Sequence, residues 1–317
     1  MRRTGPVLTV TLNPAIDKTV TLPAFEYGGL NRVQQMRVDA GGKGINVAKV
    51  LNSFGIPVEA WGFAAGHQGN VIREKLNAAG IPSKLLETPG ETRVNLKIVD
   101  ESTKETTELN EPGVPVDEET LRRFENEFKQ AAEQASVVVL GGSLPPGAPP
   151  DYYRRLIELA NEQGAAVILD ADGEALAAGV KAVPYAIKPN IHELERLVQQ
   201  KLDSTEAIIR TARTLIDRGI TCVLVSMGGE GSLLITAEQA IAAKPFPITP
   251  QSTVGAGDSM VAALVYGILQ ELDAEAIARW TSAAGTVTAS KPGTQVCTLD
   301  EVKESLSKVP ITHELTS

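Results

Sequence analysis

An aspartate lies where a glycine-rich turn meets an apolar segment in STVGAGDSMVAAL, residues 252–264. The apolar run after Asp258 predicts a helix. The N-terminus of a helix attracts anions, because its first N–H groups are unpaired and carry partial positive charge. Two interpretations therefore fit Asp258, which is either a helix cap or a catalytic base beside a bound phosphate.

A second glycine-rich turn, GGKG at residues 41–44, precedes another helical pattern. It is not a Walker phosphate loop, which needs four residues between its glycines and Ser or Thr after its lysine. A glycine pair before a helix still lets the backbone approach a ligand closely. We expect Lys43 and Asn46 to point from the first helical turn at such a ligand; the alternative is a tight turn with a solvated lysine.

Basic residues recur in segments that alternate with period two. Arg93 and Lys97 are four apart in TRVNLKI and so share one face of a strand, and Arg32 lies in a second such segment. Arginine binds phosphate with two parallel hydrogen bonds, and lysine acts as a point charge. Together with Lys43 they indicate an anionic small-molecule ligand, while a solvated strand face is the alternative for Lys97 and Arg32.

The segment KPNIHEL, residues 188–194, follows an apolar run and precedes a helix. Asn190 and Glu193 are spaced as in a capping box, in which each side chain bonds the other residue's backbone N–H. The same amide and carboxylate are also suited to holding Mg²⁺ through water, because Mg²⁺ keeps much of its hydration shell. Both interpretations stand at this point.

Composition narrows the classes of function. The 317 residues carry a net charge of −9, which argues against a nucleic-acid binder or a membrane-surface protein. Two cysteines fit a reducing compartment, and the first residues lack the long apolar stretch of a signal peptide. The expectation is a cytoplasmic protein. Its three histidines form no pattern typical of nucleophilic or metal catalysis.

Short apolar runs alternate with helical patterns along the chain. Strands are predicted at 7–12, 58–64, 137–142, 166–172, 185–190 and 222–229, and helices at 44–55 and 68–80. This alternation predicts an α/β fold with a mostly parallel sheet covered by helices on both faces. Ligands of such sheets bind beyond the carboxyl ends of the strands, where the polar residues that end these runs must meet.

Two segments depart from this alternation. Residues 12–39 and 91–110 show period two and turn residues, which predicts a small β-sheet lid over the site within a single domain spanning 1–317. The alternative is that they form edge strands of the main sheet. Residues 311–317 are predicted to be a loose tail.

Taken together, these motifs resemble a known family. VDAGGKGINVAKVL and STVGAGDSMVAAL resemble the two signatures of the ribokinase-like (PfkB-type) sugar kinases, and KPNIHEL resembles the Asn-x-x-Glu element between them. TLNPAIDKTV, GETRVNLKI, NEPG and LGGSLPPG are similar to the branch of 1-phosphofructokinase and tagatose-6-phosphate kinase. The resemblance extends from about residue 7 to 298 and implies a ribokinase-like fold.

The resemblance also implies a role for each matching residue. Asp258 matches the catalytic base, and Gly255, Ala256 and Gly257 match the anion hole for the transferring phosphoryl group. Asn190 and Glu193 match the element that organises Mg²⁺ with ATP. The positions that match sugar or sugar-phosphate contacts are Asp17, Gly41, Gly42, Lys43, Asn46 and Arg93. The nucleotide-binding positions are Lys188, Asn190, Ser226, Gly228, Gly231 and Gly257.

The implied activity is phosphorylation of a ketohexose phosphate by ATP, with fructose 1-phosphate as the first choice of substrate. Tagatose 6-phosphate and fructose 6-phosphate are the alternatives. A kinase of unphosphorylated sugars or nucleosides would not need both Lys43 and Arg93. A non-enzymatic sugar-phosphate sensor would not need to keep Asp258 and its glycines. In this family the lid often mediates a dimer, so a homodimer through the lid is one expectation.

Overall fold

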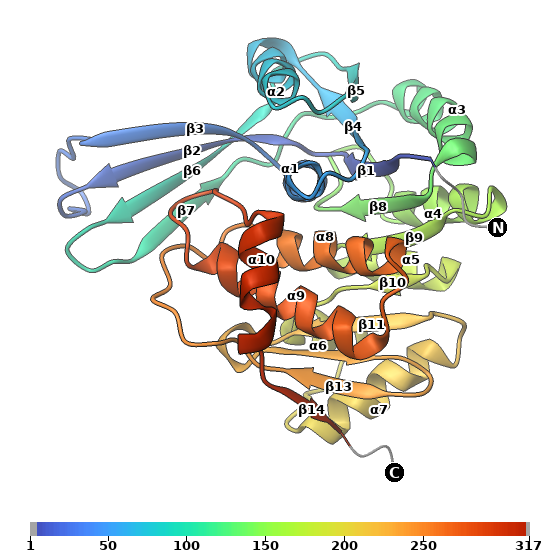
Figure 1. The fold of residues 1–317 in the computed structure, drawn as a ribbon. Helices are drawn as coiled ribbons and strands as arrows, with labels where there is room; N and C mark the ends of the chain where they lie inside the picture. The colour runs from blue at the N-terminus through green and yellow to red at the C-terminus, as the bar shows by residue number, and fades with distance from the viewer. Residues whose placement is uncertain (1–4, 315–317) are drawn as a thin grey trace.

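Two separate β-sheets organise the chain, which the structure, a computed structural model, describes over residues 5–314 (Figure 1). The larger sheet has ten strands in the order β14-β13-β12-β11-β10-β9-β8-β1-β4-β5. Its strands are β1 (Val7–Thr11), β4 (Val58–Ala64), β5 (Ser83–Glu87), β8 (Val137–Gly141), β9 (Ala166–Asp170), β10 (Ala186–Ile187), β11 (Cys222–Ser226), β12 (Ser232–Ile235), β13 (Ala240–Ala243) and β14 (Ile311–His313). The strands from β11 to β5 pair in parallel, and β12, β13 and β14 pair antiparallel.

Helices cover both faces of this sheet, as expected for strands that are apolar on both sides. They are α1 (Lys43–Ser53), α2 (Gly66–Ala78), α3 (Glu118–Gln134), α4 (Tyr152–Glu162), α5 (Gly173–Gly179), α6 (Ile191–Val198), α7 (Thr205–Ile216), α8 (Ala256–Leu269), α9 (Ala274–Ala289) and α10 (Leu299–Ser305), with short 3₁₀ turns at Val180–Ala182, Gly228–Glu230 and Leu306–Lys308. One buried cluster joins the sheet to α3–α7 and another joins it to α1, α2 and α8–α10. The predicted α/β fold is confirmed.

The smaller sheet is the predicted lid. Its strands are β2 (Ala15–Leu22), β3 (Gln35–Gly41), β6 (Arg93–Asp100) and β7 (Thr106–Asn110), in the order β3-β2-β6-β7. Figure 1 shows this sheet reaching out sideways from the main body, and none of its strands pairs with the larger sheet. The edge-strand alternative is therefore wrong, since the four strands form a sheet of their own.

Two smaller expectations need correction. Residues 311–313 are strand β14, which pairs with β13, so this part of the predicted loose tail is ordered by sheet pairing; residues 315–317 lie outside the described part. The predicted strand at 185–190 is only Ala186–Ile187, because Asn190 already caps α6. Across residues 5–314, the structure has no helix with the length and apolar character needed to cross a membrane.

Candidate active site

A cavity of about 380 Å³ lies between the lid and the carboxyl ends of the central strands. Eight residues singled out in the sequence line it, namely Asp17, Gly42, Lys43, Asn46, Arg93, Lys97, Gly255 and Asp258. Residues that the sequence analysis did not assign to the site also line it, among them Thr11, Asn13, Asn95, Glu108, Asn110 and Ser143. The cavity thus joins the two glycine-rich turns to the polar face of the lid.

Asp258 lies in the first turn of α8 and is only 7% exposed. The N-cap is Gly255, whose φ of 79° is left-handed, and no side chain caps this helix. The carboxylate of Asp258 instead accepts a hydrogen bond of 2.8 Å from Asn46 Nδ2 of α1. The interpretation of Asp258 as a helix cap is therefore wrong, because its side chain bonds another helix at the cavity.

Burial raises the pKa of Asp258, and the nearby charge of Asp170 adds to this, while Lys43 and the Asn46 hydrogen bond oppose it. Removing a donor to a carboxylate removes a preference for its ionised form. We expect Asn46→Leu to raise the pKa of Asp258 further, so that the acid limb of the kcat–pH profile moves to higher pH.

Steady-state kcat measured against pH checks this expectation. The control is Asn52→Leu on the same helix, where the exposed Asn52 bonds only the Ala79 carbonyl. Superimposable acid limbs for the wild type and Asn46→Leu would contradict the link between Asn46 and Asp258.

Two lysines converge on one buried carboxylate beside Asp258. Asp170 ends β9 and is 1% exposed, and its Oδ1 lies 2.7 Å from Lys43 Nζ and 3.4 Å from Lys188 Nζ. Burial opposes ionisation of Asp170, but the two ammonium groups hold its pKa below the usual value. Burial likewise opposes the charge of Lys43, and Asp170 and Asp258 nevertheless raise its pKa. Lys43 is therefore cationic.

The sequence analysis grouped Lys43 with Arg93 as a sugar-phosphate contact, and both residues line the cavity. The Lys43 ammonium is directed at Asp170, and Lys188 shares that carboxylate. A Cβ atom added to Gly257 would lie 3.4 Å from Lys188 Nζ, so the lysine pair borders the start of α8. Lys43 thus stands at the Asp258 end of the cavity.

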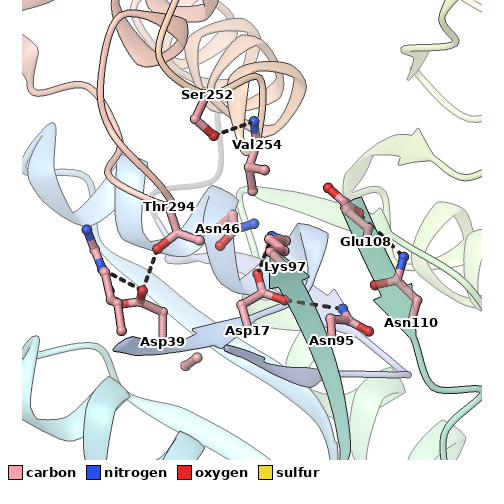
Figure 2. A network of polar contacts seen from close by, with 12 residues as sticks. Asp17, Asp39, Asn46, Asn95, Lys97, Glu108, Asn110, Ser252, Val254 and Thr294 are labelled. Carbon is pink, nitrogen blue, oxygen red and sulfur yellow. Dashed lines mark hydrogen bonds and ion pairs between the residues drawn. The ribbon is translucent and has the colours of Figure 1, made fainter. Parts of the chain in front are cut away.

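The lid contributes a buried ion pair to the other side of the cavity. Lys97 Nζ lies 3.2 Å from Asp17 Oδ2, and Asn95 Nδ2 donates to Asp17 Oδ1 over 3.2 Å (Figure 2). Both side chains of the ion pair are about 5% exposed, so the solvated-face alternative is wrong for Lys97. Arg32 is solvated, because it is exposed in the segment between β2 and β3. A Cβ atom at Gly41 would lie 2.5 Å from Asp17 Cγ, so glycine makes room for this carboxylate.

Arg93 occupies the base of β6 and has a different kind of partner. Its Nη1 and Nη2 donate to the carbonyl oxygens of Glu111 and Asn13 over 3.0 and 2.9 Å. Its Nε is buried and has no hydrogen-bond partner among the described residues. No carboxylate forms an ion pair with Arg93 in the described part of the chain, so its positive charge is available to an anionic ligand in the cavity.

The Asn-x-x-Glu element forms a complete capping box. Asn190 Oδ1 accepts from Glu193 N and Glu193 Oε2 accepts from Asn190 N, each over 2.8 Å. Asn190 also bridges to Ser226 at the end of β11, which brings two of the nucleotide-binding candidates together. Gly228 begins the 3₁₀ turn Gly228–Glu230 and Gly231 follows it; neither glycine lines the cavity between lid and sheet.

The carboxylates near this element have the chemistry that Mg²⁺ requires. Glu193 is buried and keeps Oε1 outside the capping box, and Asp170 Oδ2 is buried with no hydrogen-bond partner among the described residues. Oxygen donors with bound waters suit Mg²⁺. No group of three or more His, Cys, Asp or Glu within residues 5–314 forms an all-protein metal cage, so Mg²⁺ would have to take further ligands from water or a bound phosphate.

Asp170 and Asn95 are the notable residues that sequence reasoning missed. Asp170 ends a predicted parallel strand, at the sheet edge where ligands bind. Asn95 shares the strand face of Arg93 and Lys97, since it lies two residues after the one and two before the other. Each signal was present in the sequence, but neither residue belongs to a glycine-rich motif.

Comparison with known proteins places this chain among the carbohydrate kinases. The model of the pfkB family of carbohydrate kinases matches residues 10–301. A 1-phosphofructokinase of Xanthomonas campestris is 40% identical, over 83% of this chain and 84% of its own length. A 1-phosphofructokinase of Bacillus subtilis is 35% identical, over 97% of this chain and 99% of its own length.

Solved structures agree with this placement. Phosphofructokinase-2 of Escherichia coli in complex with fructose-6-phosphate superimposes with a TM-score of 0.89 at 30% identity, covering 96% of this chain and 99% of the other. Another structure of that enzyme is its tetrameric inhibited form. The chain belongs to the pfkB family of carbohydrate kinases. Membership of a kinase family implies ATP as the phosphoryl donor.

Proposed function

We propose that the protein transfers the γ-phosphoryl group of ATP to the C6 hydroxyl of fructose 1-phosphate. The observation that carries the proposal is one cavity that holds a buried carboxylate and an arginine. The carboxylate is Asp258, at a helix start preceded by glycine. The arginine is Arg93 of the lid, which forms no ion pair within residues 5–314. Phosphoryl transfer depends on positioning and charge stabilisation more than on covalent chemistry. This arrangement supplies both.

In the proposed reaction Asp258 accepts the proton of the attacking hydroxyl. The sugar oxygen bonds to the γ-phosphorus while the bond to the bridging oxygen of ATP breaks, which releases ADP. The backbone N–H groups of Gly255, Ala256 and Gly257 stabilise the transferring phosphoryl group without side-chain bulk. Lys43 and Lys188 add positive charge at the same end of the cavity, and the lid excludes water that would hydrolyse ATP.

The remaining candidates hold the two substrates. Asp17, Gly41, Gly42 and Asn46 form the sugar site, and Arg93 takes the sugar's existing phosphate. Ser226, Gly228 and Gly231 border the nucleotide. Asn190 and Glu193, with Asp170, would hold Mg²⁺ through water; when bound, the ion neutralises charge on the ATP phosphates.

Arg93 supports a phosphorylated substrate over a neutral sugar. A guanidinium that lines the cavity and bonds only carbonyl oxygens among residues 5–314 keeps N–H groups for a phosphate. Relatives named 1-phosphofructokinase cover nearly the full chain. The alternatives within the same mechanism are tagatose 6-phosphate and fructose 6-phosphate. A sensor without activity is the non-enzymatic alternative.

An ADP-release assay with MgATP tests the proposal. The panel is fructose 1-phosphate, tagatose 6-phosphate, fructose 6-phosphate, fructose and ribose, ranked by kcat/KM. We expect fructose 1-phosphate to lead by several decades. A higher kcat/KM for a 6-phosphate would change the substrate and keep the mechanism. Activity on neutral sugars alone would overturn the role of Arg93. No activity on any of the sugars would favour a sensor.

We also propose that the lid joins two copies of the chain. Among residues 5–314, the exposed large apolar side chains lie on the lid, at Phe25, Tyr27, Leu30, Val33, Met36 and Leu109. An exposed apolar patch of this kind is typical of a protein interface, and a second copy presents the same patch.

Charge introduced into this patch is expected to separate the subunits. For the variant Met36→Lys/Leu109→Lys we expect a monomer at concentrations where the wild type sediments as a dimer or larger. The control is Thr214→Lys, at an exposed position on α7. Sedimentation velocity over a concentration series makes the comparison, and an unchanged distribution for the double variant would rule out the lid as the interface.

A further inference from the structure

The polar face of the lid holds a hydrogen-bond acceptor that no residue within the described range 5–314 satisfies. Asn95 lies on β6 between Arg93 and Lys97 and lines the cavity with them. Its Nδ2 donates to Asp17 Oδ1 over 3.2 Å, and its Oδ1 is buried with no partner among the described residues (Figure 2). Leaving a buried carbonyl oxygen unsatisfied costs free energy, so such an atom calls for a partner that binds.

The orientation of this amide follows from its neighbours. A carboxylate only accepts hydrogen bonds, so the group that Asn95 turns towards Asp17 must be its NH₂. Lys97 donates to the other oxygen of Asp17. The Asp17 carboxylate also lies directly against Gly41, where a Cβ atom would clash with it. Asp17 is therefore fixed, and it fixes Asn95 with the amide oxygen turned away from it.

The missing partner must be a donor. An N–H or O–H group on a molecule in the cavity meets this requirement, whereas a phosphate oxygen does not. The neighbouring carboxylate of Asp17 is also an acceptor and likewise prefers a donor group on the ligand. Sugar hydroxyls are the donors that the proposed substrate brings, and its secondary hydroxyls distinguish one ketohexose from its epimers.

We propose that Asn95 is a specificity-determining residue whose amide oxygen accepts a hydrogen bond from one secondary hydroxyl of the sugar phosphate. This inference rests on the proposed function and refines it. A site built to bond a hydroxyl discriminates strongly against an analogue without it, because the buried acceptor then stays unpaired. The Asn95 hydrogen bond affects which sugar binds, and it takes no part in the proton transfer at Asp258.

A double-deletion experiment between protein and substrate tests the proposal. The wild type, Asn95→Ala and Asn95→Leu are assayed by kcat/KM with fructose 1-phosphate and with its 3-deoxy and 4-deoxy analogues. We expect the wild type to lose at least about tenfold on the analogue that lacks the bonded hydroxyl, which corresponds to one hydrogen bond. For the Asn95 variants, kcat/KM on that analogue should equal their kcat/KM on fructose 1-phosphate. Their kcat/KM on the other analogue should still be reduced.

Two further variants sharpen the test. Asn70→Ala, at an exposed position on α2 away from the cavity, makes the same chemical change as a control. Asp17→Asn shows whether Asn95 acts on its own, because a hydroxyl has one proton and donates to one acceptor. We expect Asp17→Asn to lose sensitivity to the other analogue. Loss of sensitivity to the first analogue in Asp17→Asn, with that sensitivity kept in the Asn95 variants, would mean that Asp17 is the acceptor of that hydroxyl, which overturns the inference.

The remaining outcomes are equally distinct. If Asn95→Ala lost as much kcat/KM as the wild type on the 3-deoxy analogue and on the 4-deoxy analogue, the two effects would be additive. That result would overturn the inference and leave the proposed function intact. Full activity of Asn95→Leu on all three sugars would do the same. A wild-type protein that turns over no sugar phosphate would overturn the proposed function, and the inference with it. Thermal unfolding of each variant confirms that the compared proteins are folded.

Discussion

Replacement of Asp258 by asparagine is expected to reduce kcat by about 10²–10⁴-fold, the range that general-base assistance contributes. The amide keeps the size of the side chain and removes its ability to accept the hydroxyl proton. The KM for the sugar phosphate should change little, because Asp258 acts on the proton in the transition state. Steady-state kinetics with the preferred substrate of the panel measures both values.

Stability separates this catalytic role from a structural one. Burial raises the pKa of Asp258, so the folded state favours its neutral form, and at neutral pH its charge costs folding free energy. Asp258→Asn should therefore unfold at the same urea concentration as the wild type, or a higher one. Asp203→Asn, at an exposed position, is the matched control. Normal turnover by Asp258→Asn would refute the assignment of the base.

Replacement of Lys97 by methionine is expected to lower the free energy of unfolding by about 3–5 kcal/mol, the cost of removing one partner of a buried ion pair. Methionine fills a similar volume, but the carboxylate of Asp17 loses its counter-ion 3.2 Å away in a site that is almost closed to water. Equilibrium urea unfolding measures the loss. The KM for the sugar phosphate should rise as well, because Asp17 is then no longer held in place.

Two comparisons show whether burial is the cause. Lys129→Met breaks an ion pair with Glu162 whose side chains are 50% and 61% exposed, and it should change the free energy of unfolding by less than about 1 kcal/mol. Asp17→Asn/Lys97→Met removes both charges and should recover part of the loss. If Lys97→Met and Lys129→Met were equally mild, the lid pair would not be the stabilising contact described above.

The positions of Asp258 and of the glycine-rich turns could be predicted from the sequence because their signals are local. The turn glycines before Asp258 and the apolar run after it lie within 13 residues, so pattern and helix physics are enough. The period-two segments likewise predicted the lid strands. The antiparallel strand β14 was missed, because a three-residue strand has no periodic signal and forms only through its pairing with β13.

The role of each charged residue depended on contacts that no local pattern contains. Asn46 and Asp258 are 212 residues apart, Lys43 and Asp170 are 127 apart, and Lys97 and Asp17 are 80 apart. A cluster of basic residues was therefore predictable, but not which of them already has a carboxylate partner.

The sequence by itself determined the α/β fold, the lid strands and the place of Asp258 at the start of a helix, since hydrophobic periodicity and turn chemistry act over a few residues. Only the tertiary structure decided that Lys43 pairs with Asp170, that Lys97 pairs with Asp17, and that Arg93 and the Asn95 oxygen remain available to a ligand. The physical reason is that charge pairing and burial depend on distances in space, and folding sets these between strands and helices far apart in the chain.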